Sequence, residues 1–462
     1  MIIDIYHGGN SYKWFGLHML LGIFCILSPK IIIFWFYIIL ILSLNKIISD
    51  WILRSSVRYL FPLTIYLASF EVFARLLGSS PFIPWELSKY LILLISFLNL
   101  FFLKYQMKSF FGFLLFLLLI PGIIIDSGNN ISLNQLAYNV MGPMSIACLL
   151  IIFEKDKITE IDFNSFLKLI WYSSISLLIY VAIETPDISK LNFSLNANFQ
   201  ATGGFGSNQI ATILGLGMFL SFYAWMNKLE FSGSHRIDGF FIFLFAYQGF
   251  LSFSRGGMLV GIFCILIYYL LLIRSVNYEG FTIKRKLKPA RFFGIGLFFI
   301  FSSYFIINIF SEGNINYRYL GETETTLSGE KIKTLNTITT GRYEIMEGDL
   351  ELWKENFIFG TGVGSSKLMR NNGLDRSASH NEFTRLLAEH GIFGFLYIFI
   401  LLIFFFRLVF VKKRTVGNAI VVTLFMIGVG TMVHSGMRTF VSSIFIALSS
   451  MIITENKEND IF

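Results

Sequence analysis

The chain has 462 residues, of which 55% are hydrophobic, 17% aromatic and only 14% charged, and its formal net charge is +8. Soluble domains carry about 25% charged residues, because polar side chains must cover their surface. The composition therefore excludes a soluble enzyme, a secreted disulfide-built domain and a disordered chain, and it indicates an integral membrane protein.

The apolar residues fall into segments of the length that crosses a bilayer, which is about 17–25 residues for a helix. Long apolar runs separated by polar breaks favour helices over a barrel, whose strands alternate apolar and polar residues. We predict an all-α polytopic membrane protein with 12 to 14 transmembrane helices, because the first two segments are short and only Pro29 and Lys30 separate them. The predicted spans are 14–28, 31–44, 59–78, 87–103, 109–125, 136–153, 165–183, 206–226, 239–254, 257–273, 292–310, 391–411, 418–433 and 439–453.

The basic residues of the short loops predict the orientation of these spans. One set of alternate loops holds 20 Lys and Arg, whereas the opposite short loops hold only Lys30, Lys190, Arg255 and Arg438. Because Lys and Arg concentrate in cytoplasmic loops, both termini are expected in the cytoplasm. The basic residues assigned to the cytoplasmic side are Lys13, Lys46, Arg54, Arg58, Lys104, Lys108, Lys155, Lys157, Lys228, Arg236, Arg274, Lys284, Arg285, Lys286, Lys288, Arg291, Lys412, Lys413, Arg414 and Lys457. Most of the positive charge therefore reflects the orientation of the chain in the membrane. We expect no nucleic-acid partner.

One long loop on the outer side divides the chain into three parts: an N-terminal bundle (1–310), a large periplasmic loop (311–390) and C-terminal helices with a short tail (391–462). The loop holds 9 basic and 12 acidic residues. Loops of this length are functional or disordered, and are not simple connectors. From Tyr343, the apolar positions Met346, Leu350, Trp353 and Phe357 predict an amphipathic helix against the membrane face. A second helix is expected to start at Ser379.

Arg255 is the first candidate site residue. It lies between two apolar runs on the sparsely basic outer side, in the sequence Ser254-Arg255-Gly256-Gly257. An ionisable residue at membrane depth is costly and is a functional candidate by default. The alternative is an arginine whose side chain reaches the interface at a tight helical turn.

The sequence Ser379-His380-Asn381-Glu382 predicts a capping box, in which Ser379 is the N-cap and Glu382 bonds back to its N–H. His380 would then lie in the first helical turn, where the dipole disfavours imidazolium and leaves a neutral ring that accepts a proton. The alternative for His380 is an exposed polar loop residue. Arg385 and Glu389 are four residues apart and are expected to pair on the helix.

Further arginines share the loop or face the same side. Arginine suits bidentate recognition of phosphate, so Arg342, Arg370, Arg376 and Arg385 are candidates, although any one of them can be a solvated surface charge. His434 and Arg438 lie in the short connection between the last two spans. The glycine-rich segment 360–364, with Gly362 and Gly364, is either a tight turn between helices or a backbone nest for a pyrophosphate. No residues have metal-ligand spacing and no nucleotide-binding motif is present, so we predict no metal or other cofactor.

Taken together, these segments resemble the O-antigen ligase and O-antigen polymerase superfamily over roughly residues 200–440. The residues that carry the resemblance are Ser254-Arg255-Gly256-Gly257, Thr340-Gly341-Arg342, the glycine turn 359–364 and the segment 379–391, which begins Ser379-His380-Asn381-Glu382. Segments 139–143 and 203–208 also resemble the polymerases of surface polysaccharides.

The resemblance implies a metal-independent, inverting glycosyltransferase with a glycosyltransferase-C-like arrangement of helices in the bacterial inner membrane. The donor would be an undecaprenyl-pyrophosphate-linked oligosaccharide at the periplasmic face, and membrane lipids and a polysaccharide chain-length regulator would be partners. By position, Arg255 matches the arginine that binds pyrophosphate and His380 matches the loop histidine, with Arg342 and Arg385 as weaker matches. A polymerase is favoured, a ligase that acts on lipid A–core is the alternative, and a flippase or other transporter is a third hypothesis from another class.

Overall fold

The computed structural model describes residues 10–52, 60–101, 109–125, 131–278, 283–370, 378–411 and 416–454. Within these ranges the chain is almost entirely helical. The predicted all-α polytopic membrane fold is therefore confirmed. The basic residues Arg54, Arg58, Lys104, Lys108, Lys412, Lys413, Arg414 and Lys457, which contributed to the predicted orientation, lie outside the described residues, as does Arg376.

The first half of the chain forms a helical bundle that reaches α13. Its elements are α2 (Ser11–Leu27), α3 (Ile31–Ile52), α4 (Leu60–Ser69), α5 (Glu71–Leu76), α6 (Leu87–Phe101), α7 (Phe110–Ile124), α8 (Leu133–Phe153), β1 (Lys157–Thr159), α9 (Glu160–Glu184), η1 (Ile188–Lys190), η2 (Gln200–Thr202), α10 (Ser207–Asn227), α11 (His235–Leu251), α12 (Arg255–Tyr278) and α13 (Ile283–Phe310).

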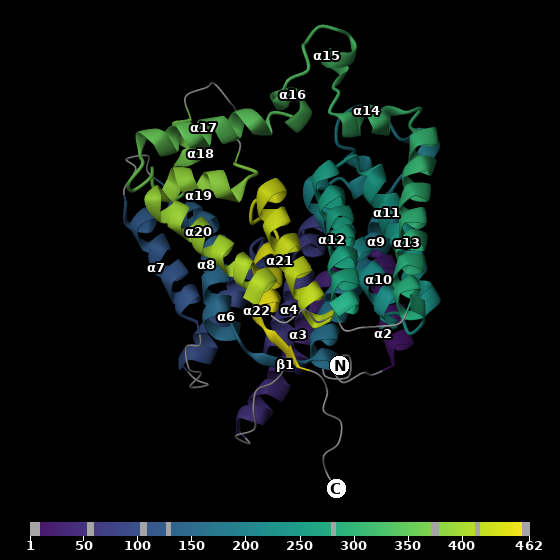
Figure 1. Cartoon of the computed structure of the whole chain (residues 1–462), viewed down its shortest axis with the longest axis horizontal. Helices are drawn as coiled ribbons and strands as arrows, with labels where there is room; N and C mark the ends of the chain where they lie inside the picture. The colour runs from purple at the N-terminus through teal and green to yellow at the C-terminus, as the bar shows by residue number, and fades with distance from the viewer. Residues whose placement is uncertain are drawn as a thin grey trace.

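Short helices follow α13 and lead into the last long helices. They are α14 (Asn314–Leu320), α15 (Glu324–Leu327), α16 (Leu335–Thr339), α17 (Arg342–Glu355), α18 (Ser366–Met369) and α19 (Glu382–His390). The chain then forms α20 (Ile392–Phe406), a π-helical turn (Arg407–Val411), α21 (Val416–Ser435), α22 (Val441–Ser450) and β2 (Ile452–Thr454). Helices α14–α19 form a layer at one end of the bundle, and the parallel pair of short strands β1 and β2 lies at the opposite end (Figure 1).

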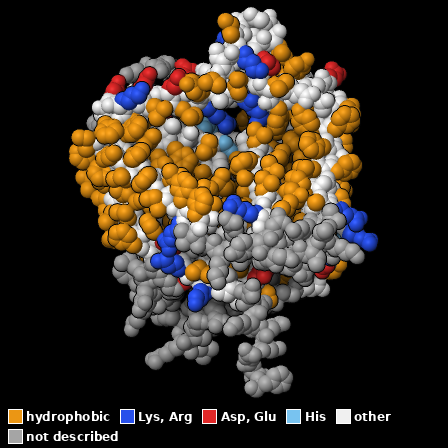
Figure 2. Space-filling model, in the orientation of Figure 1, with side chains coloured by type: hydrophobic (Ala, Val, Ile, Leu, Met, Phe, Trp, Pro, Cys, Tyr) orange, Lys and Arg blue, Asp and Glu red, His pale blue; other side chains and the backbone are white. Residues whose placement is uncertain are grey.

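Seven helices in the described ranges are long and apolar enough to cross a membrane, namely α8, α9, α10, α12, α13, α20 and α21, and five shorter apolar helices accompany them. Within the described residues each of the 14 predicted spans overlaps a helix, although the expected single span 59–78 is divided at Phe70 into α4 and α5. The outer face of α13 carries exposed Phe298, Phe301 and Phe305. A broad apolar surface covers the side of the bundle (Figure 2). Such a surface is stable in lipid, where helices satisfy their own backbone hydrogen bonds.

In the core, the C-terminal helices α21 and α22 pack against helices of the N-terminal bundle. Helix α10 packs on α11 and α12, α12 packs on α21, and α21 packs on α22, which also contacts α8. Helix α10 is almost completely buried. Glycines permit the close approach of α10 and α12, because a Cβ at Gly215 would lie 2.3 Å from the main-chain oxygen of Gly257. This packing holds the start of α12 beside the end of α21, under the α14–α19 layer.

Candidate functional site

Arg255 begins α12, as the break between two apolar runs predicted. Its guanidinium reaches up into the α14–α19 layer, where Nη1 donates to the main-chain oxygen of Arg318 at 3.0 Å and Nη2 donates to that of Ile338 at 2.5 Å. Arg318 is itself buried, and its Nε donates to the main-chain oxygen of Phe253 at 3.3 Å. The two arginines therefore connect the end of the bundle to α14 and α16.

Arg342, the first residue of α17, joins the same region. Its Nη1 donates to the main-chain oxygen of His434 at 3.2 Å, and Asn208 Nδ2 donates to the same oxygen at 3.1 Å. His434 is 8% exposed, and neither of its ring nitrogens has a hydrogen-bond partner among the described residues. Its ring packs against Gly256, where a Cβ would lie 2.9 Å from His434 Cγ. The glycine beside Arg255 thus makes room for the histidine.

His380 lies close to these residues, but the local structure differs from the predicted capping box. The N-cap of α19 is Asn381, whose Oδ1 accepts from the N–H of Phe383 at 2.9 Å. Ser379 Oγ donates to the main-chain oxygen of Asn381 at 3.0 Å, and Glu382 bonds to Arg385. Ser379 and Glu382 are therefore not the capping pair, because the helix begins later than predicted and the side chain of Asn381 accepts a hydrogen bond from its first turn. His380 precedes the helix and is outside its first turn.

The neutral state expected for His380 has a different cause from the helix dipole. Burial, followed by the charges of Arg438, Arg342 and then His434, lowers the pKa of His380 to about 3. Its Nδ1 is buried and has no hydrogen-bond partner among the described residues. Arg342 is affected in the same way, since burial and the charges of Arg255 and Arg438 lower its pKa.

Four arginines, Arg255, Arg318, Arg342 and Arg438, form what we call the arginine cluster. Each donates to a main-chain carbonyl, and in the described residues no carboxylate lies within ion-pair distance of any of them. Figure 2 shows a hollow under the α14–α19 layer in which Lys or Arg and His side chains are visible. Uncompensated positive charge beside buried, unpartnered histidine nitrogens would be stabilised by an anionic ligand.

Arg385 has a different role from the arginine cluster, because all five of its N–H groups bond to the protein. Nε and Nη2 donate to the Glu382 carboxylate and Nη1 to Glu389 Oε2 at 2.9 Å, which confirms the expected pairing of Arg385 with Glu389. Nη1 and Nη2 also donate to Oδ1 and the main-chain oxygen of Asn139 at 3.2 and 2.8 Å. Arg385 therefore fixes α19 to α8 and has no donor left for a substrate.

The glycine-rich turn 360–364 is also committed to the protein. The N–H groups of Thr361, Gly362 and Val363 donate to the main-chain oxygens of Ala388, Glu389 and Gly122 at 2.8, 3.1 and 3.0 Å. The Gly364 N–H bonds to the Glu389 carboxylate. Gly362 and Gly364 adopt φ of 85° and 82°, which glycine accepts most readily. The segment is thus a tight turn between helices, and the interpretation as a pyrophosphate nest is wrong because its N–H groups are already bonded.

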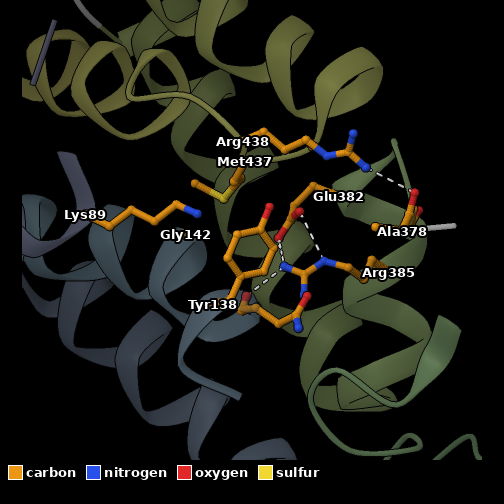
Figure 3. A pocket seen from close by; sticks show the side chains of 11 residues that line it. Lys89, Tyr138, Gly142, Ala378, Glu382, Arg385, Met437 and Arg438 are labelled. Carbon is orange, nitrogen blue, oxygen red and sulfur yellow. Dashed lines mark hydrogen bonds and ion pairs between the residues drawn. The ribbon is translucent and has the colours of Figure 1, made fainter. Parts of the chain in front are cut away.

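Arg370 lies apart from the arginine cluster. Its Nε is 3.4 Å from Asp349 Oδ1 of α17, and both side chains are buried. Its charge is thus paired with a carboxylate, unlike the charges of the arginine cluster. Arg438, in contrast, lies between α21 and α22 and donates from Nη2 to the main-chain oxygen of Ala378 at 3.2 Å, beside His380 (Figure 3).

Comparison with known families agrees with the resemblance found in the sequence. Residues 240–399 match the family model described as O-antigen ligase. This region belongs to the O-antigen ligase and polymerase superfamily. No curated protein and no solved structure matches the chain.

The O-antigen ligase region includes Arg255, Arg318, Arg342 and His380, whereas His434 and Arg438 come from beyond it. Sequence reasoning did not single out Arg318, because nothing in its local sequence separates it from other basic residues of the loop. Arg75 was also missed as a site neighbour: besides its ion pair with Glu71, it donates from Nη1 to the main-chain oxygen of Arg438 at 2.6 Å. Only the tertiary packing brings these residues together.

Proposed function

We propose that the protein is a surface-polysaccharide polymerase of the O-antigen ligase superfamily. It transfers a growing glycan from undecaprenyl pyrophosphate to a hydroxyl of another lipid-linked repeat unit at the periplasmic face of the inner membrane. The observation that carries the proposal is the arginine cluster, which lies without a carboxylate partner beside His380. A glycosyl pyrophosphate donor needs this combination, because negative charge develops on its leaving group while the acceptor hydroxyl loses a proton.

The donor pyrophosphate lies against Arg255, Arg318 and Arg342 in this proposal. The acceptor oxygen attacks the anomeric carbon from the opposite side, a new carbon–oxygen bond forms, and the bond to the pyrophosphate oxygen breaks. The hydroxyl proton goes to His380, and the electron pair of the broken bond leaves with undecaprenyl pyrophosphate. The configuration at the anomeric carbon is inverted, and cleavage of the bond between the sugar and the pyrophosphate supplies the energy.

The donor also prepares the base. Without an anion, burial and the surrounding positive charge keep the pKa of His380 at about 3, which makes a weak base. A bound pyrophosphate offsets the charges of Arg342 and Arg438, so this part of the shift is relieved and the pKa of His380 rises, while burial still holds it below its ordinary value. The base therefore becomes effective when the donor is in place.

Polymerase and ligase share this chemistry and differ in the acceptor. Of the two segments that resemble polymerases, 203–208 touches the site, because Asn208 donates to the main-chain oxygen of His434, and 139–143 lies behind it, because Arg385 bonds to Asn139. These contacts support the polymerase as the first candidate. A ligase that transfers the glycan to lipid A–core is the second.

Lipopolysaccharide from a deletion strain separates the two on a gel. Loss of a polymerase leaves core plus a single repeat unit, whereas loss of a ligase leaves bare core. Unchanged long chains in the deletion strain would contradict both. Purified protein that moves lipid-linked units across a bilayer without joining them would instead support the transporter hypothesis.

A further inference from the structure

A second polar pocket lies beside the segment that carries His380, with the preceding residues Ala378 and Ser379 in its lining. It is a small open pocket between α6, α8, the start of α19 and the connection from α21 to α22, and its space together with the adjoining open solvent is about 360 Å³. Its polar lining includes Lys89, Tyr138, Glu382, Arg385 and Arg438 (Figure 3). Lys89 and Tyr138 lie far upstream of the O-antigen ligase region and were not predicted as site residues.

Lys89 is the unusual member of this pocket. The residue is only 4% exposed, and in the described part of the chain no carboxylate lies within ion-pair distance of its ammonium. Its nearest partner is the ring of Tyr138, with Nζ 4.9 Å from the ring centre. Figure 3 shows the ammonium directed toward the pocket with no hydrogen bond to the residues drawn. The nearby acidic residues Glu86 and Glu382 are beyond ion-pair distance of this ammonium, and such a charge in a nearly buried residue is costly, which indicates a binding role.

The other charges leave the pocket positive. Glu382 lines it, but the Nε and Nη2 groups of Arg385 bond to both oxygens of this carboxylate. Arg438 uses Nη2 for a main-chain carbonyl, so its charge is not paired. Lys89 and Arg438 therefore present two positive charges, and the Tyr138 hydroxyl offers a hydrogen-bond donor.

We infer that this pocket binds an anionic group of the acceptor, a carboxylate or a phosphate, and so selects an acidic acceptor for the transfer. The inference rests on the proposed function, because the acceptor must lie within reach of His380. Arg438 belongs both to the arginine cluster and to this pocket, and its charge and that of Arg342 act on His380. His380 is thus near both positive sites, with the donor at Arg255, Arg318 and Arg342 and the acceptor at Lys89.

Direct binding to the full chain in detergent micelles tests this inference by isothermal titration calorimetry. Two probes separate the sources of the anion: methyl glucuronate represents a sugar carboxylate, and inorganic pyrophosphate represents a lipid headgroup. Pyrophosphate is titrated into Arg342→Gln protein, in which the arginine cluster is weakened. Lys89→Met should weaken binding of at least one probe by about 10-fold or more, because a charged hydrogen bond is lost. Lys168→Met is the matched control, since it removes another buried lysine that donates to Ser11 Oγ at 2.7 Å.

A loss confined to glucuronate identifies a sugar carboxylate, and a loss of pyrophosphate binding identifies a phosphate headgroup; both results support the inference. If Lys89→Met does not fold, Tyr138→Phe replaces it, with a weaker loss expected. Wild-type protein that binds neither probe, or folded variants that bind both as tightly as wild type, would overturn it. Binding does not require turnover, so failure of the transfer activity and failure of this inference are separate results.

Discussion

Arg342 Nη1 donates to the main-chain oxygen of His434 at 3.2 Å, which joins the first turn of α17 to the last turn of α21. Ninety-two residues separate them in the chain. This bond brings a basic residue of the α14–α19 layer to the mouth of the helical bundle, and it places the positive charge of Arg342 near His380.

Arg342→Gln should lower the rate of glycan transfer by about 100-fold, because loss of one group that stabilises developing charge typically costs about 10²–10³. Lys354→Gln, an exposed basic residue on the same helix, should transfer at the wild-type rate. Initial rates with lipid-linked repeat units measure both. Equal rates for the two variants would remove Arg342 from the site.

The fold predicted from the sequence agrees with the structure because hydropathy alone sets the position of membrane helices. The site was only partly predictable. Arg255 could be identified from its local sequence, because it interrupts two apolar runs. Arg318 and Lys89 could not, because only contacts with residues far away in the chain place them in a site. The capping motif at Ser379 failed because Asn381, two residues later, is an equally good cap. The glycine turn failed as a phosphate nest because its N–H partners, such as the oxygen of Glu389, come from another helix.

Replacing Arg385 should affect folding before it affects chemistry. Arg385→Ala would leave the buried carboxylates of Glu382 and Glu389 without their partner, which costs about 3–5 kcal/mol. Thermal unfolding in detergent should show a clearly lower midpoint. The exposed Glu355→Gln should stay within about 0.5 kcal/mol of wild type. A normal midpoint for Arg385→Ala would show that the network does not stabilise the fold.

The stability of the folded chain should depend on His380 between its two pKa values. Because the pKa falls from about 6.5 in the unfolded chain to about 3 in the folded one, the unfolded state binds the proton first as the pH decreases. This contribution to stability is fully present above pH 6.5, declines as the pH falls from 6.5 to 3, and levels off below that. His380→Asn should flatten this part of the stability profile. An identical slope in both proteins would contradict the assigned pKa.

Bound pyrophosphate should raise the pKa of His380. In protein labelled with ¹³C-histidine, the His380 resonance should titrate near pH 3 alone and at a higher pH with pyrophosphate. Arg438→Gln should raise the pKa of His380 without the ligand, because it removes the largest charge that acts on the ring. A titration midpoint that pyrophosphate leaves unchanged would show that the donor does not prepare the base.

Gly256 tests the position of His434. A Cβ at Gly256 would lie 2.9 Å from His434 Cγ and 3.0 Å from its Cβ, so Gly256→Ala must displace the His434 side chain or move the start of α12 from the end of α21. We expect transfer to fall by about 10-fold or more, since a shift of about 1 Å in a site is costly. Gly294→Ala on α13 meets no atom within 4 Å and should be silent. Rates at equal protein levels in membranes compare the two.

The central claim is that His380 beside the arginine cluster performs glycan transfer. The most direct test incubates purified protein in lipid nanodiscs with lipid-linked repeat units, without ATP or an ion gradient, and measures the length of the products. Wild-type protein should form polymer, and His380→Ala protein with a normal melting midpoint should form at least about 100-fold less. Polymer formed by folded His380→Ala protein at the wild-type rate would contradict the account.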